Sequence, residues 1–135
     1  MEKEERSKFK IIIVDDSDFA RRTIAGILEG AGFLVIGQGK GAEEAIKLTI
    51  TTPPDLLILD VVMPELSGID VAKFIIEKKI KTAIMMVSSL TSDHIILDSI
   101  RNGASDFLKK PFTKDDLISA VEKIGDNIKL QNSQG

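Results

Sequence analysis

Two short runs of aliphatic residues, each followed at once by aspartate, restrict the fold of this chain more than any other feature. Residues 11–14 lead into Asp15 and Asp16. Residues 56–59 lead into Asp60. Apolar runs this short, bounded by polar residues, are typical of strands that are buried on both faces of a sheet. The three carboxylates are therefore expected where two buried strands end.

Strand-like runs and amphipathic helical patterns alternate along the chain. The expected strands cover residues 9–14, 33–37, 55–59, 82–87 and 106–108, and the expected helices cover residues 17–30, 41–51, 67–79, 92–102 and 113–128. Five β-α units of this kind predict an α/β fold, with a parallel sheet covered by helices on both faces. We expect the flavodoxin-like, doubly wound strand order 2-1-3-4-5, in which the first and third strands are neighbours.

The length of 135 residues fits one domain, which we place at residues 9–128, with residues 1–8 and 129–135 as flexible tails. The net charge of −3 gives no basic surface for nucleic acid, and no apolar stretch is long enough to span a membrane. The N-terminus lacks the apolar region of a signal peptide. We therefore expect a cytoplasmic protein.

The chemistry expected at the strand ends is that of a hard divalent cation. Mg²⁺ prefers oxygen ligands, and Asp15, Asp16 and Asp60 would repel one another without a cation between them. The chain has no cysteine and one histidine, which argues against zinc or copper. An aspartate beside Mg²⁺ can attack a phosphoryl group. The fifth strand leads into Lys109 and Lys110 and the fourth into Ser88 and Ser89, so a lysine and hydroxyl groups are expected at the same edge.

Four stretches that contain these residues resemble the receiver domain of two-component response regulators, most closely the single-domain chemotaxis type. They are residues 11–22 (IIIVDDSDFARR), 55–70 (DLLILDVVMPELSGID), 85–90 (MMVSSL) and 102–112 (NGASDFLKKPF). The resemblance extends over most of residues 9–125, in the order that the family has. It implies a phosphoacceptor that assists its own phosphorylation and dephosphorylation and is not an enzyme acting on other substrates.

Position by position, the resemblance implies that Asp60 is the phosphoacceptor. Asp16 would be the main carboxylate ligand of Mg²⁺, with Asp15 holding a metal-bound water and the backbone carbonyl of Val62 as a further ligand. Lys110 would pair with the phosphoryl group, and the bond to the following proline is usually cis in the family.

Two further residues correspond to the family's switch. Ser88 would donate a hydrogen bond to the phosphoryl group, and Phe107 would then turn inward. The implied partners are a sensor histidine kinase and an unidentified output protein, with the chain a monomer or a weak dimer. The resemblance favours a regulator of the chemotaxis or motor type, with an intermediate phosphorelay shuttle as the alternative.

Two positions depart from the pattern common in the family. Val62 and Leu90 are apolar where many relatives carry polar side chains. Both positions are expected to flank the path of a hydrolytic water. Our hypothesis is that these apolar groups make the acyl phosphate long-lived.

Two functions of other classes also fit parts of the pattern. A phosphohydrolase of the haloacid dehalogenase type uses strand-end aspartates and Mg²⁺, but its two aspartates share one strand end and it carries a cap module. A flavodoxin-like electron carrier is disfavoured because the loop after the first strand is acidic, and because the chain contains no tryptophan or tyrosine to stack on a flavin.

The remaining interpretations concern packing. The helical spacing over residues 17–30 places Phe19 in the apolar stripe of that helix. Arg21 and Arg22 are expected on its solvated side, and Lys109 is expected to be a solvated charge at a strand end.

Overall fold

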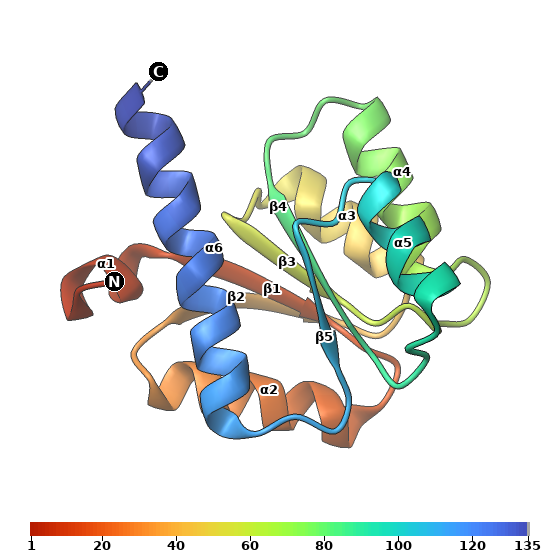
Figure 1. Ribbon diagram of the computed structural model, residues 1–135, viewed down its shortest axis with the longest axis horizontal. Helices are drawn as coiled ribbons and strands as arrows, with labels where there is room; N and C mark the ends of the chain where they lie inside the picture. The colour runs from red at the N-terminus through yellow and green to blue at the C-terminus, as the bar shows by residue number, and fades with distance from the viewer. Residues whose placement is uncertain (135) are drawn as a thin grey trace.

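The computed structural model describes residues 1–134, in which five parallel strands form one sheet between two layers of helices (Figure 1). The strands are β1 (Lys10–Val14), β2 (Leu34–Gly39), β3 (Leu56–Leu59), β4 (Ala83–Ser88) and β5 (Asp106–Lys109). Their order is β2-β1-β3-β4-β5, and every neighbouring pair is parallel. The predicted flavodoxin-like α/β fold is confirmed.

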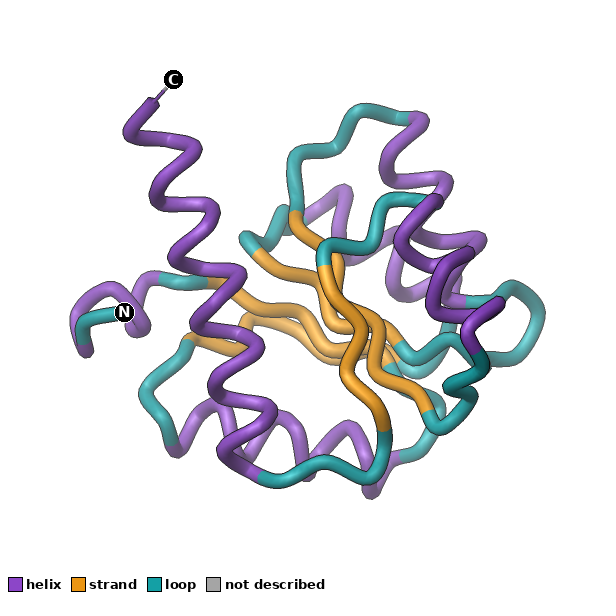
Figure 2. The backbone as a smooth tube through the Cα atoms, viewed as in Figure 1, coloured by secondary structure: helices purple, strands orange, loops and turns teal. Residues whose placement is uncertain are grey.

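Helices cover both faces of this sheet, as Figure 2 shows. They are α1 (Lys3–Lys8), α2 (Asp18–Gly30), α3 (Ala42–Thr51), α4 (Gly68–Glu77), α5 (Asp93–Arg101) and α6 (Lys114–Gln134). Side chains alternate across the strands, so that Ile11 and Ile13 pack with α2 and α6 in one core. Ile12 and Val14 pack with α3 and α4 in the other core. The sheet is therefore buried on both faces, which explains why its strands are almost wholly apolar.

Capping side chains fix where several helices begin, among them α4 and α6. The Ser67 hydroxyl accepts from the Asp70 N–H, and the Asp70 carboxylate accepts from the Ser67 N–H, which confirms the expected capping box at α4. Thr113 and Asp116 exchange the same two hydrogen bonds at the start of α6. These caps fix the path of the chain as it leaves the carboxyl edge of the sheet after β3 and β5.

The two ends of the chain differ from the expectation of flexible tails. Residues 3–8 form α1, and α6 continues to Gln134 through most of the segment from residue 129 that was expected to be a tail. The two helices contact each other: Glu5 pairs with Lys129 at 2.9 Å, and Arg6 pairs with Glu122. Because a helix of six residues is unstable alone, these contacts explain its formation here. The domain limits of 9–128 stay a prediction.

A separate question is whether any helix can cross a membrane. Among the helices described over residues 1–134, none is both long and apolar enough to do so.

Candidate functional site

The three aspartates come together because β1 and β3 are neighbours in the sheet. Val14 pairs with Leu59 at the carboxyl ends of the two strands, so Asp15 and Asp60 follow at the same edge. Asp15, Asp16 and Asp60 each offer a carboxylate oxygen, and these oxygens all lie within 4.8 Å of one another. Asp15 is buried and Asp16 is exposed. The structure thus forms the oxygen cluster that the sequence predicted.

Asp15 is held at four of its atoms. Its N–H donates to the Gly39 carbonyl at 3.1 Å, and its Oδ1 accepts from the Ser17 N–H at 2.9 Å. Its Oδ2 accepts from Lys110 at 2.7 Å, and its backbone carbonyl accepts from Arg21 at 2.9 Å. The buried Asp15 carboxylate is therefore fixed in place before any ligand arrives.

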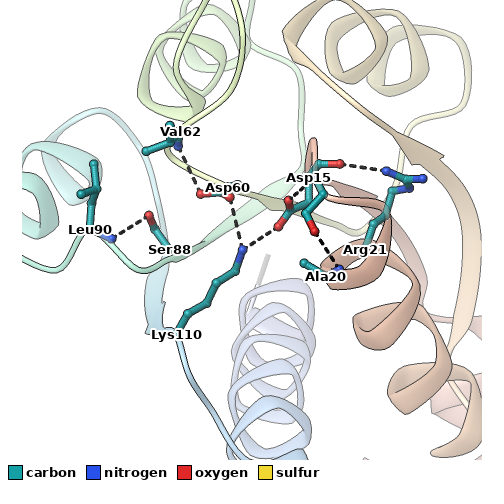
Figure 3. Close-up of polar contacts among 9 residues, drawn as sticks. Asp15, Ala20, Arg21, Asp60, Val62, Ser88, Leu90 and Lys110 are labelled. Carbon is teal, nitrogen blue, oxygen red and sulfur yellow. Dashed lines mark hydrogen bonds and ion pairs between the residues drawn. The ribbon is translucent and has the colours of Figure 1, made fainter.

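Lys110 reaches two of the three carboxylates from the end of β5 (Figure 3). Its Nζ lies 2.7 Å from Asp15 Oδ2 and 3.2 Å from Asp60 Oδ2. The bond from Lys110 to Pro111 is cis, as the resemblance implied. Lys109 is exposed, as expected. Of the two neighbouring lysines, Lys110 is the one that the structure places in the cluster.

Burial and neighbouring charges shift the pKa values of Asp60 and Lys110. Burial raises the pKa of Asp60, and the Asp15 charge adds to this, while Lys110 and the Val62 N–H partly oppose it. Burial alone would lower the pKa of Lys110, but the hydrogen bonds and charges of Asp15 and Asp60 outweigh it and raise that pKa. The Lys110 ammonium therefore keeps its positive charge among the three aspartates. The cluster retains an excess of negative charge, which favours a bound cation.

Val62, Ser88 and Leu90 lie around Asp60 as the strand ends dictate. The Val62 N–H donates to Asp60 Oδ1 at 3.1 Å. Ser88 is fully buried, and its Oγ accepts from the Leu90 N–H at 3.1 Å. The Val62 and Leu90 side chains are about half exposed, at 51% and 48%. Coordination of a cation by the Val62 carbonyl stays a prediction.

Phe107 is half-buried on β5, where it pairs with Met86 of β4. Its ring packs against the core that contains Ile12, Val14 and Met86. This position is compatible with either ordinary packing or a rotating switch, and the rotation stays a prediction.

Arg21 is the residue at the site that the sequence analysis placed wrongly. It was expected on the solvated side of α2, but it is only 6% exposed, whereas Arg22 is exposed as expected. Its guanidinium donates to the Asp15 carbonyl at 2.9 Å and to Asp18 Oδ1 at 2.6 Å. The available signal was the spacing of Asp18 and Arg21, because residues three apart share a helix face.

Phe19 was also placed wrongly, since its side chain is 83% exposed and does not join the buried stripe of α2. It lines an apolar groove of about 430 Å³ between α2 and the segment after β5. Ile27, Phe112 and Lys110 also line this groove. An apolar surface thus lies directly beside the acidic cluster.

Comparison with known proteins gives concordant matches. The family model described as the response regulator receiver domain matches residues 11–122. The chemotaxis protein CheY of Listeria monocytogenes is 34% identical over 114 residues, which are 84% of this chain and 96% of that protein. CheY of Bacillus subtilis is 35% identical over 114 residues, which are 84% of this chain and 95% of that protein.

A solved structure is similar in both fold and sequence. It is the complex of CheX and CheY with BeF₃ and Mg²⁺ from Borrelia burgdorferi. The match has a TM-score of 0.81 and 30% sequence identity, and it covers 86% of this chain and 88% of that chain.

Proposed function

Because the chain belongs to the response regulator receiver family, we propose that it accepts a phosphoryl group from a histidine kinase onto Asp60 and signals through protein contacts. The observation that carries this proposal is the placement of Asp60 beside the Lys110 ammonium, with its carboxylate oxygen within 4.8 Å of those of the two other aspartates. An acceptor carboxylate, a cation and a further acidic pair are the groups that phosphoryl transfer to aspartate requires.

The transfer step forms one bond and breaks one bond. A carboxylate oxygen of Asp60 attacks the phosphorus of a phosphohistidine, the new P–O bond forms, and the P–N bond breaks. The imidazole of the donor leaves with the electron pair of that bond and takes up a proton. Lys110, 3.2 Å from Asp60 Oδ2, lies where it can pair with the transferred phosphoryl oxygens.

The donor set fits Mg²⁺. Three carboxylates supply oxygen atoms within 4.8 Å of one another, and the chain contains no cysteine to favour a softer metal. Asp15, Asp16, Asp60 and the Val62 carbonyl would hold the ion. When bound, it would supply positive charge beside the phosphoryl oxygens. The named presence of Mg²⁺ in the Borrelia burgdorferi complex supports this assignment.

The apolar groove beside the cluster is where we place the phosphoryl donor. A donor histidine has to approach Asp60 from the open carboxyl edge, and Phe19, Phe112 and Lys110 line the groove at this edge. An exposed aromatic side chain in such a place is typical of a protein contact. The groove thus offers the partner apolar surface next to the reacting group.

Output would follow from Ser88 and Phe107. Ser88 would exchange its bond from the Leu90 N–H for a bond to the phosphoryl group, and Phe107 would turn inward, changing the face made by α5, β5 and α6. Several relatives matched over nearly their whole length are named chemotaxis protein CheY, which supports a regulator of that type.

Intact-mass spectrometry tests the proposal. The wild type and Asp60→Asn are incubated with acetyl phosphate, with and without Mg²⁺. We expect one phosphoryl group on the wild type only with Mg²⁺, and none on the variant. Labelling of the variant equal to that of the wild type, or steady release of phosphate from a small phosphate ester, would overturn the proposal, the second result in favour of a phosphohydrolase.

A further inference from the structure

Arg21 is a buried cation that the proposed phosphoryl transfer does not use. Its side chain leaves the end of the first turn of α2 and is 6% exposed. Burying a guanidinium is costly unless it is paired and hydrogen-bonded. An apolar side chain of similar size would fill the same space, and such replacements are often neutral for stability. The contacts of Arg21 therefore need an explanation other than packing.

The guanidinium binds the backbone of the proposed metal-binding turn. Nη1 donates to the carbonyl of Asp15 at 2.9 Å, and this carbonyl belongs to the peptide that joins Asp15 to Asp16. The orientation of that peptide sets the directions in which the two neighbouring side chains leave the chain. Figure 3 shows Arg21 reaching Asp15 from the side opposite Lys110, so the two cations hold Asp15 between them.

A second anchor fixes the guanidinium itself. Nη2 donates to Asp18 Oδ1 at 2.6 Å, and the same oxygen lies 3.6 Å from Lys40 Nζ, next to α3. The planar fork of arginine can span two acceptors in this way, whereas the single ammonium of lysine cannot match its geometry. Asp18 is about half exposed, so the solvent can replace Arg21 as its partner.

We propose that Arg21 is a positioning residue that orients the Asp15–Asp16 peptide and thereby sets the affinity of the site for a divalent cation. Residues that hold metal ligands by hydrogen bonds commonly affect metal affinity about 10- to 100-fold. This inference rests on the proposed cation site, but it concerns cation binding and not the transfer to Asp60.

The sign of the effect separates positioning from simple charge. If Arg21 acted only through its charge, removing this cation would strengthen the binding of a divalent cation, because like charges repel. If Arg21 positions the turn, the same removal weakens binding. Arg21→Lys keeps the charge but loses the fork, so positioning predicts weaker binding for this variant as well.

The test measures Mn²⁺ binding to the unphosphorylated chain by the electron paramagnetic resonance signal of free Mn²⁺. Arg21→Met, Arg21→Lys and Asp18→Asn are compared with the wild type and with Arg22→Met, an exposed neighbour on the same helix. We expect Arg21→Met and Arg21→Lys to raise the dissociation constant about tenfold or more, and Asp18→Asn to raise it less. Arg22→Met should leave it within about twofold of the wild type.

Thermal unfolding without metal accompanies each titration. A dissociation constant that is unchanged or lower in folded Arg21→Met and Arg21→Lys would overturn the proposal, as would an equal rise in Arg22→Met. If Arg21→Met does not fold, Arg21→Lys and Asp18→Asn decide the matter by the same criterion. Because the readout is Mn²⁺ binding, a failure to label Asp60 would refute the proposed function and leave this comparison valid.

Discussion

The carboxyl edge of the sheet and the contact between α1 and the last turns of α6 are held together in different ways. At the edge, Asp15 is 2% exposed and accepts hydrogen bonds from Ser17, Arg21 and Lys110. At the helix contact, Glu5 pairs with Lys129, and their side chains are 30% and 64% exposed, respectively. Buried, multiply bonded groups are rigid, whereas exposed ion pairs contribute little.

This difference indicates where the protein tolerates amino-acid substitutions. Positions at the edge are set by the sheet itself, because each side chain follows a strand whose register is fixed by buried residues. Positions at the helix contact are set by a few ion pairs whose side chains are partly or largely exposed. We expect substitutions at the edge to affect both stability and phosphorylation, and substitutions at the helix contact to affect neither strongly.

The largest effect on stability is expected for Gly68→Ala, because this substitution adds an atom directly against the backbone of Asp60. A Cβ on Gly68 would overlap the backbone carbonyl oxygen of Asp60, so either α4 or Asp60 has to shift. We expect a loss of stability of about 2–4 kcal/mol, measured by urea unfolding, and little labelling by acetyl phosphate.

Gly26→Ala is the matched control, because an added Cβ there meets no atom within 4 Å in the middle of α2. It should stabilise the protein by about 0.5–1 kcal/mol and leave labelling unchanged. Equal stability of the two variants would contradict the tight packing of α4 against Asp60.

Lys110→Met should slow labelling of Asp60 about 100-fold, because it removes the cation beside the developing phosphoryl charge. Lys109→Met removes an exposed charge one residue earlier and serves as the control. The initial rate of the mass increase gives both values. Equal rates for the two variants would show that the ammonium of Lys110 plays no part in the transfer.

The lifetime of the acyl phosphate tests the apolar flanks of the edge. Val62 and Leu90 are half exposed around Asp60, and polar replacements there would bind and orient a water. The double variant Val62→Asn with Leu90→Glu should lose its phosphoryl group about tenfold faster than the wild type. Mass spectra taken over time after removal of the donor measure the loss. A wild type that loses phosphate as fast as the double variant would refute the hypothesis.

The smallest effect is expected at the helix contact, for Glu5→Gln. The hydrogen bond from Lys129 holds the pKa of Glu5 below its ordinary value of 4.5. A carboxyl with a lowered pKa in the folded state stabilises above the ordinary value, and this contribution is lost as the pH falls through the lowered pKa.

At neutral pH the melting temperature of Glu5→Gln should therefore fall by less than about 2 °C, and the difference from the wild type should vanish in acid. Differential scanning calorimetry at several pH values measures it. A loss comparable to that of Gly68→Ala would mean that α1 is as essential as the edge.

The edge could be predicted from the sequence because its signals are local and repeated. Residues 11–14 and 56–59 are so uniformly apolar that they specify buried strands, and the polar residue after each strand is then placed by topology. This argument predicts the meeting of Asp15, Asp16 and Asp60, whereas the choice of Lys110 over Lys109 depends on the resemblance to the receiver family. The strand order followed from the number of β-α units.

The rest depends on contacts that the local pattern does not encode. Residues 3–8 form a helix that contacts α6 and the Ala31 carbonyl at the end of α2, and a six-residue segment has no periodicity from which to predict this. Helical spacing placed Phe19 in the buried stripe, but the buried side of α2 is formed by Arg21, Ile24, Ala25 and Leu28. Phe19 and Thr23, one turn later, are both exposed. Arg21 is buried because its guanidinium donates to the Asp15 carbonyl and to the Asp18 carboxylate. Its charge alone would predict an exposed side chain.

The most direct test of the central claim is to locate the phosphoryl group within the chain. Borohydride reduces an aspartyl phosphate to homoserine, and tandem mass spectrometry of peptides then gives its position. After treatment with acetyl phosphate and Mg²⁺, the account predicts homoserine at position 60 and at neither Asp15 nor Asp16, with the product absent when Mg²⁺ is omitted. Homoserine at another aspartate, or the same yield at position 60 without Mg²⁺, would contradict it.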